Sequence, residues 1–498
     1  MAAAASRKKK RTGAGIAGPV SRRRKLRLIF TSVMAGVIAC ALGAAFIVIP
    51  SAKYATAKKL MAEGDSFAAM EELSQIYSFR DAAALYSKGA TQIGDSFLAL
   101  GWNINAAVWF TKAGRSLEAE QIFDFNSVVM GASYVTAGIA QNGKTYYLSD
   151  RIGDDRRAGA QAIASYAGFL PHAPGVNGVD KFGFLKTHAL GNYGLKLPGE
   201  QMEELSAEVN VKDMISAEGT GSAPDYAVLL YKNGSVKIVS EVEHPLTNTK
   251  SWRDIVSIRE GYRKIFGIDS AGKLHIAYES SYPEELRYDI SGWPAVQKVV
   301  ETGKAVVGLT REGGIAVAYA GTDATYGHSI LHQKDITDIA TNSNILLLLR
   351  ANGSVKAIRV PNWAADAASG ADGYLDKAVA AVGRWRGVTR VRFAAKGIYG
   401  IRFNGAVYYV SCDVSYDSGT RKYAYDAHAD FAAEVSRWTD VVDVISCGTH
   451  AVAVREDGTL KALGDGTYLE PRSTITGATD YIRKTGGSYM NVEDWKLW

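Results

Sequence analysis

The second half of the chain repeats one pattern six times: an aromatic or polar opening residue, an Ile/Val strand, a break of small residues, a second apolar strand, and a Gly turn into a third strand. In five copies the opening residue stands 20 or 21 residues before the turn glycine, a spacing that unrelated strands have no reason to share. The copies run from Val211 to Gly234, Trp252 to Gly272, Trp293 to Gly314, Gln333 to Gly353, Trp385 to Gly405 and Trp438 to Gly458. A fixed period of short strands is typical of a β-propeller.

Two weaker copies precede these six, one from Ser127 to Gly143 and one around Phe182 to Gly191, which lacks the turn glycine. The sequence therefore predicts a mainly β fold, a seven-bladed propeller, or eight units if the terminal copies do not share a blade. The propeller should occupy residues 126–498 with a C-terminal closing segment.

The recurring tryptophans and turn glycines are expected to be structural. The tryptophans should wedge between neighbouring blades, and Asn-Gly or Asp-Gly supplies the positive φ angles of a two-residue hairpin turn. These residues are Trp252, Trp293, Trp385, Trp438, Gly234, Gly272, Gly314, Gly353, Gly405 and Gly458.

The last copy carries the clearest family signature. It reads Trp438-Thr-Asp-Val441, then Cys447-Gly-Thr-His450 and Asp457-Gly458-Thr-Leu460. This pattern resembles the repeat of the regulator of chromosome condensation family, over residues 126 to 466. The resemblance implies a propeller but transfers no binding residue, because the loops between repeats match no motif.

The N-terminus separates sharply from the rest of the chain in charge. Ten Lys and Arg and no acidic residue lie within residues 1–27, which leaves 47 basic against 51 acidic residues for the remainder. A nucleic-acid-binding body would keep its basic excess on the folded part. We therefore expect no nucleic-acid partner and interpret residues 1–27 as a basic cytoplasmic tail.

An uncharged apolar run follows the tail from Leu28 to Ile49, and Pro50 closes it. Its length suits a single membrane span, and the clustered bases should stay cytoplasmic. Residues 28–50 are thus predicted to be a transmembrane helix with the C-terminus extracellular. Two alternatives stay open, signal-peptidase cleavage at Ala55-Thr-Ala57 and lipidation at Cys40, whose context loosely resembles a lipobox.

Residues 51–125 change to helical spacing between the span and the propeller. A shift of 37 residues overlays Met61-Ala-Glu-Gly64 on Leu98-Ala-Leu-Gly101, and Ala69 on Ala106. This resembles tetratricopeptide-like repeats and predicts two helical hairpins that form a short stalk. Since about three repeats are normally needed for independent stability, the pair should lean on the propeller or the membrane.

Catalytic and metal-binding patterns are missing from the sequence. Cys412 and Cys447 lie in strand-like sequence, where packing is favoured over pairing, and no cluster completes a zinc set around His328 and His332. There is no P-loop and no nucleophile elbow. We expect neither enzyme activity nor a cofactor or metal, and a propeller-based hydrolase or lyase is the least favoured alternative.

Two insertions break the repeat spacing. They lie in Pro361 to Arg384, which holds Trp363 and Tyr374, and in Asp413 to Arg437. The second contains Tyr416, Arg421, Tyr423 and Tyr425 in what reads as a loop without strand alternation. Tyr and Arg are enriched at binding hot spots, so these six residues are predicted to bind a partner. The loop with Tyr282 and Tyr288 is a weaker candidate.

Together these features predict a membrane-anchored, extracytoplasmic binding or scaffold protein that presents its propeller to a protein or a cell-wall polymer. Low cysteine usage in an exported body is common in Gram-positive bacteria. An alternative is an envelope-complex component that docks through its helical repeats.

Overall fold

The chain is described by a computed structural model. A few isolated positions apart, the described residues are 44–132, 135–149, 163–171, 177–187, 199–217, 226–240, 249–303, 305–320, 328–342, 344–360, 372–417, 422–447, 450–464, 467–471, 481–485 and 494–498.

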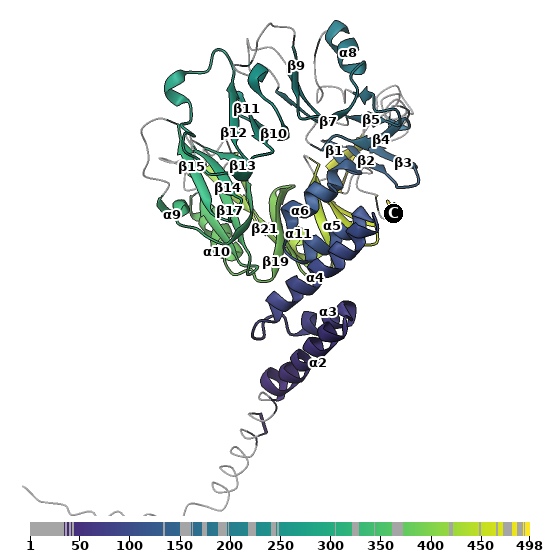
Figure 1. Ribbon diagram of the computed structural model, residues 1–498, viewed down its shortest axis with the longest axis vertical. Helices are drawn as coiled ribbons and strands as arrows, with labels where there is room; N and C mark the ends of the chain where they lie inside the picture. The colour runs from purple at the N-terminus through teal and green to yellow at the C-terminus, as the bar shows by residue number, and fades with distance from the viewer. Residues whose placement is uncertain are drawn as a thin grey trace, which may run out of the picture.

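Eight three-stranded antiparallel sheets are present among the described residues, arranged around a central axis (Figure 1). They are β1 (Val129–Ala132), β2 (Val135–Ile139) and β3 (Thr145–Ser149); β4 (Tyr166–Phe169), β5 (Gly178–Asp180) and β6 (Leu185–Lys186); β7 (Val211–Ala217), β8 (Tyr226–Tyr231) and β9 (Val236–Ser240); β10 (Ile255–Gly261), β11 (Lys264–Asp269) and β12 (Leu274–Tyr278); β13 (Val296–Thr302), β14 (Ala305–Thr310) and β15 (Ile315–Tyr319); β16 (Ile336–Thr341), β17 (Ile345–Arg350) and β18 (Val355–Arg359); β19 (Val388–Ala394), β20 (Gly397–Arg402) and β21 (Val407–Ser411); and β24 (Val441–Ser446), β25 (His450–Arg455) and β26 (Leu460–Gly464). The prediction of a mainly β, propeller-like fold is confirmed.

The first strand of each regular sheet lies nearest the axis, where first strands of neighbouring sheets contact one another. The middle strands are the most buried, as in the fully buried run Ile345 to Leu349 of β17. The turn to the third strand uses a glycine with positive φ, for example Gly353 at 74° and Gly458 at 81°. Where two glycines are adjacent, Gly313 takes the positive φ of 77° rather than the predicted Gly314.

Three of the four opening tryptophans, Trp252, Trp293 and Trp385, pack against glycines in the middle strand of their own sheet. A Cβ on Gly267 would come within 2.5 Å of the Trp252 ring, and one on Gly400 within 2.6 Å of Trp385. Trp252 also shares its apolar cluster with β8 residues of the preceding sheet. The small residue in the middle strand therefore makes room for a ring that fills the space between two sheets.

The C-terminus completes the first sheet in the same way. The Trp495 ring packs against Gly138 of β2, as Trp252 does against Gly267. Leu497 N–H donates to the Gly458 carbonyl at 2.9 Å. Val441 N–H donates to the Gly405 carbonyl at 3.0 Å in the same way, at the junction between two consecutive sheets. The last residues of the chain thus supply the opening segment for the first sheet, which joins the two ends of the ring.

Two further hairpins, β22 (Asp413–Asp417) with β23 (Lys422–Asp426) and β27 (Thr467–Pro471) with β28 (Tyr481–Thr485), lie outside the three-stranded sheets. Short helices α8 (Gly199–Ser206), α9 (His328–Leu331), α10 (Asp372–Val382) and α11 (Ala429–Val435) precede several first strands. Phe431 and Val435 of α11 are buried, and Val435 shares an apolar cluster with Trp438. The prediction of a loop after Asp413 is therefore wrong, because this segment contains a hairpin and a helix.

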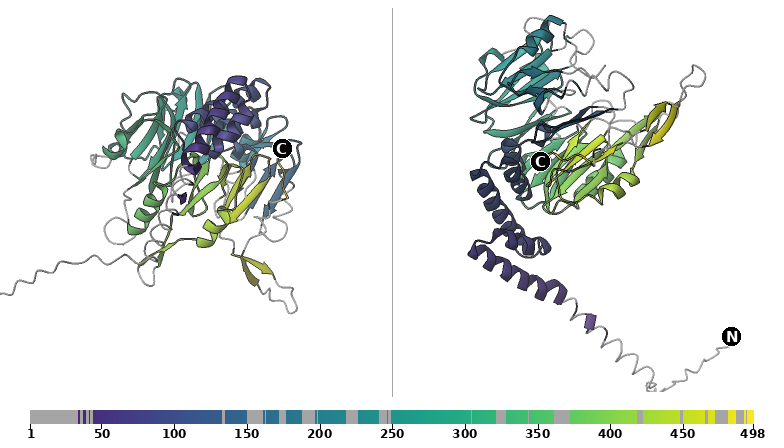
Figure 2. Two further views of the ribbon diagram at one scale, coloured as in Figure 1. Left: turned by 90° about the horizontal axis from the view of Figure 1, so that it is seen from below. Right: turned by 90° about the vertical axis from the view of Figure 1, so that its right-hand side faces the viewer.

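Residues 49–122 form five helices: α2 (Ile49–Glu63), α3 (Ser66–Gln75), α4 (Ala82–Ala99), α5 (Asn103–Lys112) and α6 (Ser116–Ile122). Gly64 and Gly101 end α2 and α4 with φ of 86° and 74°. The helices lie on one side of the disc, and the yellow hairpin β27–β28 projects on the other (Figure 2). The ring of Tyr77 stacks on Phe403 at 3.7 Å between centroids, so the helical segment is packed onto the propeller.

The predicted transmembrane helix, residues 28–50, falls mostly outside the described residues, as does Cys40. No helix in the described part of the chain is long and apolar enough to cross a membrane. Cys412 and Cys447 are both unpaired, and burial raises the pKa of each thiol to about 12.

Candidate functional site

The disc has two faces, which follow from the strand register. Ile255 at the start of β10 pairs with Asp269 at the end of β11, whereas Gly261 pairs with Lys264 at the opposite end. We call the side with the turns from middle to third strand, such as 403–405 and 456–458, the helix face, because Tyr77 stacks there on Phe403. The side with the turns from first to middle strand, such as 262–263, is the far face.

Charged residues recur at one position of the first strands on the helix face. Seven of the described first strands carry a β-bulge just after their first residue, and the pairing resumes at the third residue. The third residue is Gly168 in β4, and in the other six strands it is polar: Asp213, Ser257, Lys298, Asp338, Arg390 and Asp443. A bulge re-aims a side chain, and here it places a ring of polar groups of both signs around the axis.

The aspartates at this position also accept a hydrogen bond from a backbone N–H group at the bulge. The Asp338 carboxylate accepts from Ile339 N–H at 2.8 Å, and the Asp443 carboxylate accepts from Val444 N–H at 2.8 Å. Met214 N–H donates to Asp213 in the same way at 2.9 Å. A buried backbone donor that the bulge takes out of the ladder thus finds a partner within its own strand.

Neighbouring members of the ring form ion pairs. Lys298 Nζ lies 2.6 Å from Asp338 Oδ1, and Arg390 pairs with Asp443, both of which are fully buried. Arg392 lies two residues after Arg390 in β19, and its Nε donates to the Asp443 carboxylate at 3.0 Å. Removing charges from water is costly, so such groups persist only when paired and hydrogen-bonded.

Helix α6 closes this network over part of the axis. The Ser116 carbonyl accepts from Arg390 Nη2 at 2.9 Å, and the Glu120 carboxylate pairs with Arg392. Burial alone would raise the pKa of Glu120, but the Arg392, Lys298 and Arg390 cations outweigh it and hold that pKa well below its usual range. The helix is therefore tied to β19 directly, and through Arg390 and Arg392 to Asp443 of β24.

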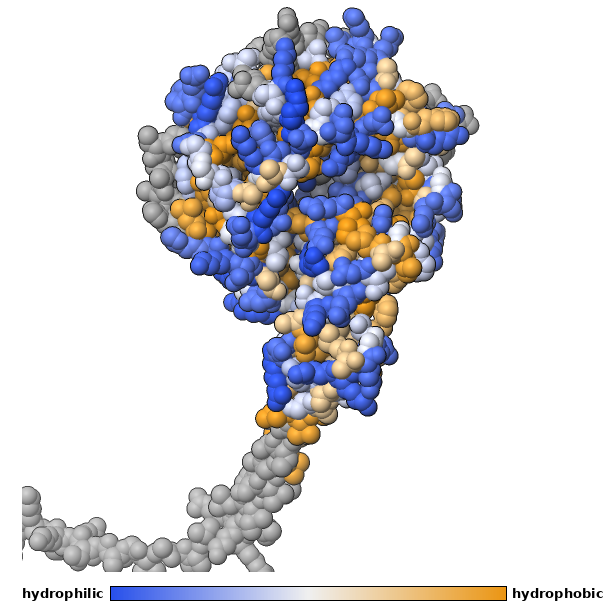
Figure 3. All heavy atoms as spheres, viewed as in Figure 1, coloured by the Kyte–Doolittle hydropathy of each residue, from blue (hydrophilic) through white to orange (hydrophobic). Residues whose placement is uncertain are grey.

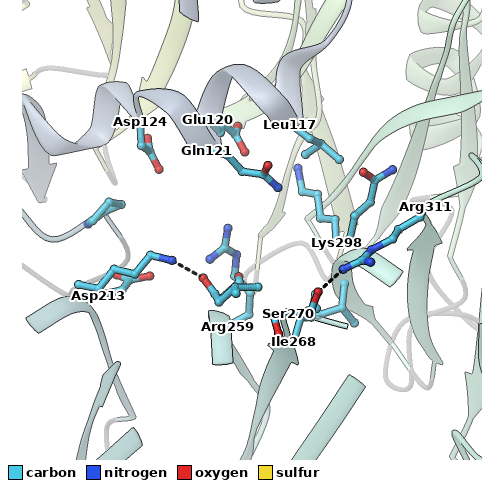
Figure 4. A pocket seen from close by; sticks show the side chains of 16 residues that line it. Leu117, Glu120, Gln121, Asp124, Asp213, Arg259, Ile268, Ser270, Lys298 and Arg311 are labelled. Carbon is cyan, nitrogen blue, oxygen red and sulfur yellow. Dashed lines mark hydrogen bonds between the residues drawn. The ribbon is translucent and has the colours of Figure 1, made fainter. Parts of the chain in front are cut away.

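A cavity of about 510 Å³ remains beside α6, over β7, β10 and β13 (Figure 4). Glu120, Gln121 and Asp124 border it from the helix side, and the strands contribute cations and polar groups from below. Two of these cations bind backbone carbonyls: Lys212 Nζ donates to Val256 at 2.7 Å and Arg311 to Ser270 at 2.7 Å.

Figure 3 shows this face with a hollow near its centre and hydrophilic side chains around it. No group of three or more metal-ligating side chains occurs in the part of the chain that the structure describes. The lining is polar and of mixed sign, which suits recognition of a polar surface better than burial of an apolar ligand.

The predicted partner-binding residues are brought together in part. Tyr416 of β22 lies directly opposite Tyr423 of β23, and Tyr425 is opposite Val414. The register gives these three tyrosines positions on the same face of the hairpin. Arg421 and Trp363 lie outside the described residues, and Tyr374 lies in α10 on a different element.

The sequence contains a signal for this hairpin. Val414, Tyr416, Tyr423 and Tyr425 alternate with small or polar residues, which is the period of a strand. The ring of polar groups also has a signal, since in five strands a charged residue stands two positions after the Ile or Val that opens the strand, and in β10 this position is Ser257. The prediction of a loop after Asp413 misses the first signal, and no prediction rests on the second.

No family model matches the chain, and no curated protein matches it. Solved structures that resemble it include Prp20p of Saccharomyces cerevisiae, with 11% identity over 68% of this chain and 91% of that chain and a TM-score of 0.32; the yeast protein is also called RCC1. The computationally designed protein Ika8 has 14% identity over 58% of this chain and 80% of its own, with a TM-score of 0.32. The CRINKLY WD40 ectodomain of the Arabidopsis thaliana receptor kinase ACR4 has 10% identity over 53% and 85%, with a TM-score of 0.31. Scores at this level carry no conclusion about function.

Proposed function

We propose that this protein is a membrane-anchored binding or scaffold protein that holds a protein partner on the far face of its propeller, outside the cytoplasm. The propeller consists of eight units, the first of which is completed by the C-terminus. The protein is not an enzyme. The basic tail and the apolar run of residues 28–50 support the anchor and its orientation.

The observation that carries the proposal is the position of the β22–β23 hairpin. It follows Ser411 at the end of β21, and Ser411 pairs with Gly397 at the far-face end of β20. The helices α2–α6 lie on the opposite side of the disc (Figure 2), so they leave the far face uncovered. Cross-strand tyrosines give a large, rigid contact area at low entropy cost.

The alternative, docking through the helical segment, is favoured by one specific observation. Phe67, Leu100 and Trp102 near the α2–α3 and α4–α5 turns are 56%, 64% and 55% exposed, and Leu98 is exposed beside them. A contiguous exposed apolar patch often marks an interaction surface. We call these four residues the helix patch.

One experiment separates the two surfaces. The chain is expressed in its own cells and crosslinked, and the captured proteins are compared among three variants. The first replaces residues 415–424 with a short Gly/Ser turn. The second replaces Leu100 and Trp102 with Ser. The third shortens β27–β28, a hairpin without a Tyr–Tyr pair, as the matched control.

Loss of a captured protein only in the first variant supports the far-face proposal. Loss only in the second supports docking through the helix patch. Capture that is unchanged in both contradicts both surfaces. Protease added to intact spheroplasts tests the orientation: it should digest the propeller and spare the N-terminal tail, and a protected propeller would overturn the extracytoplasmic location.

A further inference from the structure

A second cavity, of about 390 Å³, opens on the far face between the sheets β10–β12 and β13–β15. Its lining combines Tyr262, Tyr282 and Tyr288 with Lys264 and Glu301, and small apolar residues complete the wall. It lies at the opposite ends of β10 and β11 from the cavity beside α6. Concave sites of this size with mostly apolar walls and a few convergent polar groups are typical of small-ligand binding.

Lys264 is a departure from the repeat. It is the first residue of a middle strand and is only 1% exposed. Other middle strands begin with residues that carry no charge at neutral pH: Val135, Gly178, Tyr226, Ala305, Ile345, Gly397 and His450, whose pKa burial lowers to about 3. Folding alone favours an uncharged residue here, because desolvating an ammonium group costs free energy.

The carboxylate beneath the cavity already accepts several hydrogen bonds. Glu301 Oε1 accepts from Lys264 Nζ at 2.5 Å and from the Tyr288 hydroxyl at 2.8 Å. Glu301 Oε2 accepts from Tyr262 N–H at 2.7 Å. The Lys264 ammonium also lies 4.8 Å from the centre of the Tyr282 ring and 5.2 Å from that of Tyr288. These contacts hold the Lys264–Glu301 pair in place as the floor of the cavity.

Arg263 provides donors at the edge of the same cavity. Its Nε donates to Glu279 at 2.8 Å and its Nη2 to Ser281 at 2.5 Å, which uses two of the five guanidinium N–H groups. The side chain is one-quarter exposed. The exposed ring of Tyr262 lies beside it in sequence and in the cavity wall.

We propose that this cavity binds an organic carboxylate attached to a ring or another apolar body. The carboxylate lies against the Arg263 guanidinium, which suits it in geometry and charge, and the body packs on Tyr262 and Tyr282. A ligand cation would face Arg263 and Lys264, whereas Glu301 already accepts three of the roughly four hydrogen bonds that a carboxylate can accept. The site goes beyond the proposed partner surface and does not depend on membrane anchoring.

The probes are phenylacetate, its neutral isostere phenylacetamide and the cation phenethylamine, titrated into the full chain and followed by tyrosine fluorescence. Phenylacetate should bind roughly tenfold or more tighter than phenylacetamide, the effect of one charged hydrogen-bonded contact, and phenethylamine weakest. Equal binding of phenylacetate and phenylacetamide would overturn the proposal, as would an absence of phenylacetate binding.

Arg263→Gln should weaken phenylacetate binding by roughly tenfold. Arg311→Gln, which changes an arginine of the cavity beside α6, is the matched control and should leave it unchanged. Tyr262→Ala removes an exposed ring without touching the ion pairs and provides a second variant if Arg263→Gln does not fold. Wild-type affinity in whichever of these variants folds contradicts the site.

Glycylphenylalanine and its C-terminal amide identify the source of the carboxylate. Discrimination between these two peptides supports a chain terminus of a protein or peptide as the ligand. Binding of phenylacetate without either peptide supports a free small molecule.

Discussion

The two faces of the disc use charge in opposite ways. On the helix face, Asp443 and Arg390 are fully buried, and the network extends to Glu120 of α6. On the far face, the buried Lys264–Glu301 pair forms the floor of a cavity beside an exposed Tyr262. The two sets lie at opposite ends of the propeller's strands, and they differ in what covers each end. The helix that closes over the charged ring makes that ring structural, whereas the uncovered pair forms the floor of an open cavity.

The largest effect is expected in the core that both faces share. Trp252→Ala should lower the free energy of unfolding by about 4 kcal/mol, since a large ring that fills the space over Gly267 is lost. Denaturant unfolding of the purified chain measures it. An unchanged unfolding midpoint would show that the tryptophans do not hold the sheets together.

A somewhat smaller loss, about 3 kcal/mol, is expected for Asp443→Asn on the helix face. The amide can still accept from Val444 N–H, but Arg390 is left as a buried cation without its carboxylate. Combining this change with Arg390→Leu should recover part of the loss. If the single variant were as stable as wild type, the charged ring would not hold α6 and the contrast between the faces would fail.

The junction that closes the ring should be sensitive to acid. His450 of β25 lies 2.6 Å from the Thr136 hydroxyl of β2, and burial lowers its pKa from 6.5 to about 3. The unfolded chain binds the proton more readily, so stability falls as pH decreases from 6.5 towards 3, by at most about 1.4 kcal/mol per pH unit. His450→Gln should flatten this dependence in unfolding curves measured across that range. An equal slope in both proteins would contradict the assignment.

The smallest effect on stability is expected for the far-face hairpin. Replacing residues 415–424 with a Gly/Ser turn should change the free energy of unfolding by less than about 0.5 kcal/mol, because β22 and β23 pair with each other and not with a three-stranded sheet. Phe431→Ala in the adjoining α11 is the control and should cost about 3 kcal/mol, since that ring is buried. A large loss from the hairpin change would make this insertion structural as well.

The repeated sheets were predictable because their signals are local. A positive φ at Gly353, alternation along a strand and a small residue under a tryptophan each act within one unit, and repetition makes them visible. The ends of helices α2 and α4 at Gly64 and Gly101 follow from local signals as well. The hairpin around Tyr416 had the same kind of signal, but the broken period led to its interpretation as a loop.

Both candidate cavities depend on contacts that no local pattern contains. Lys298 and Asp338 are 40 residues apart, and Arg390 meets the Ser116 carbonyl across 274 residues. Lys264 likewise finds Glu301 only because two neighbouring sheets converge at the far face.

The sequence by itself determined the unit, its turns and its core, since these depend on backbone preferences and burial within about 40 residues. The sequence also predicted a C-terminal closing segment, but tertiary structure alone decided that Trp495 and Leu497 are the residues that complete the first sheet, that α6 covers one end of the axis, and which buried charges are enclosed. The physical reason is that ion pairing and ring closure depend on distances between units, and these are fixed only when the units pack around a common axis.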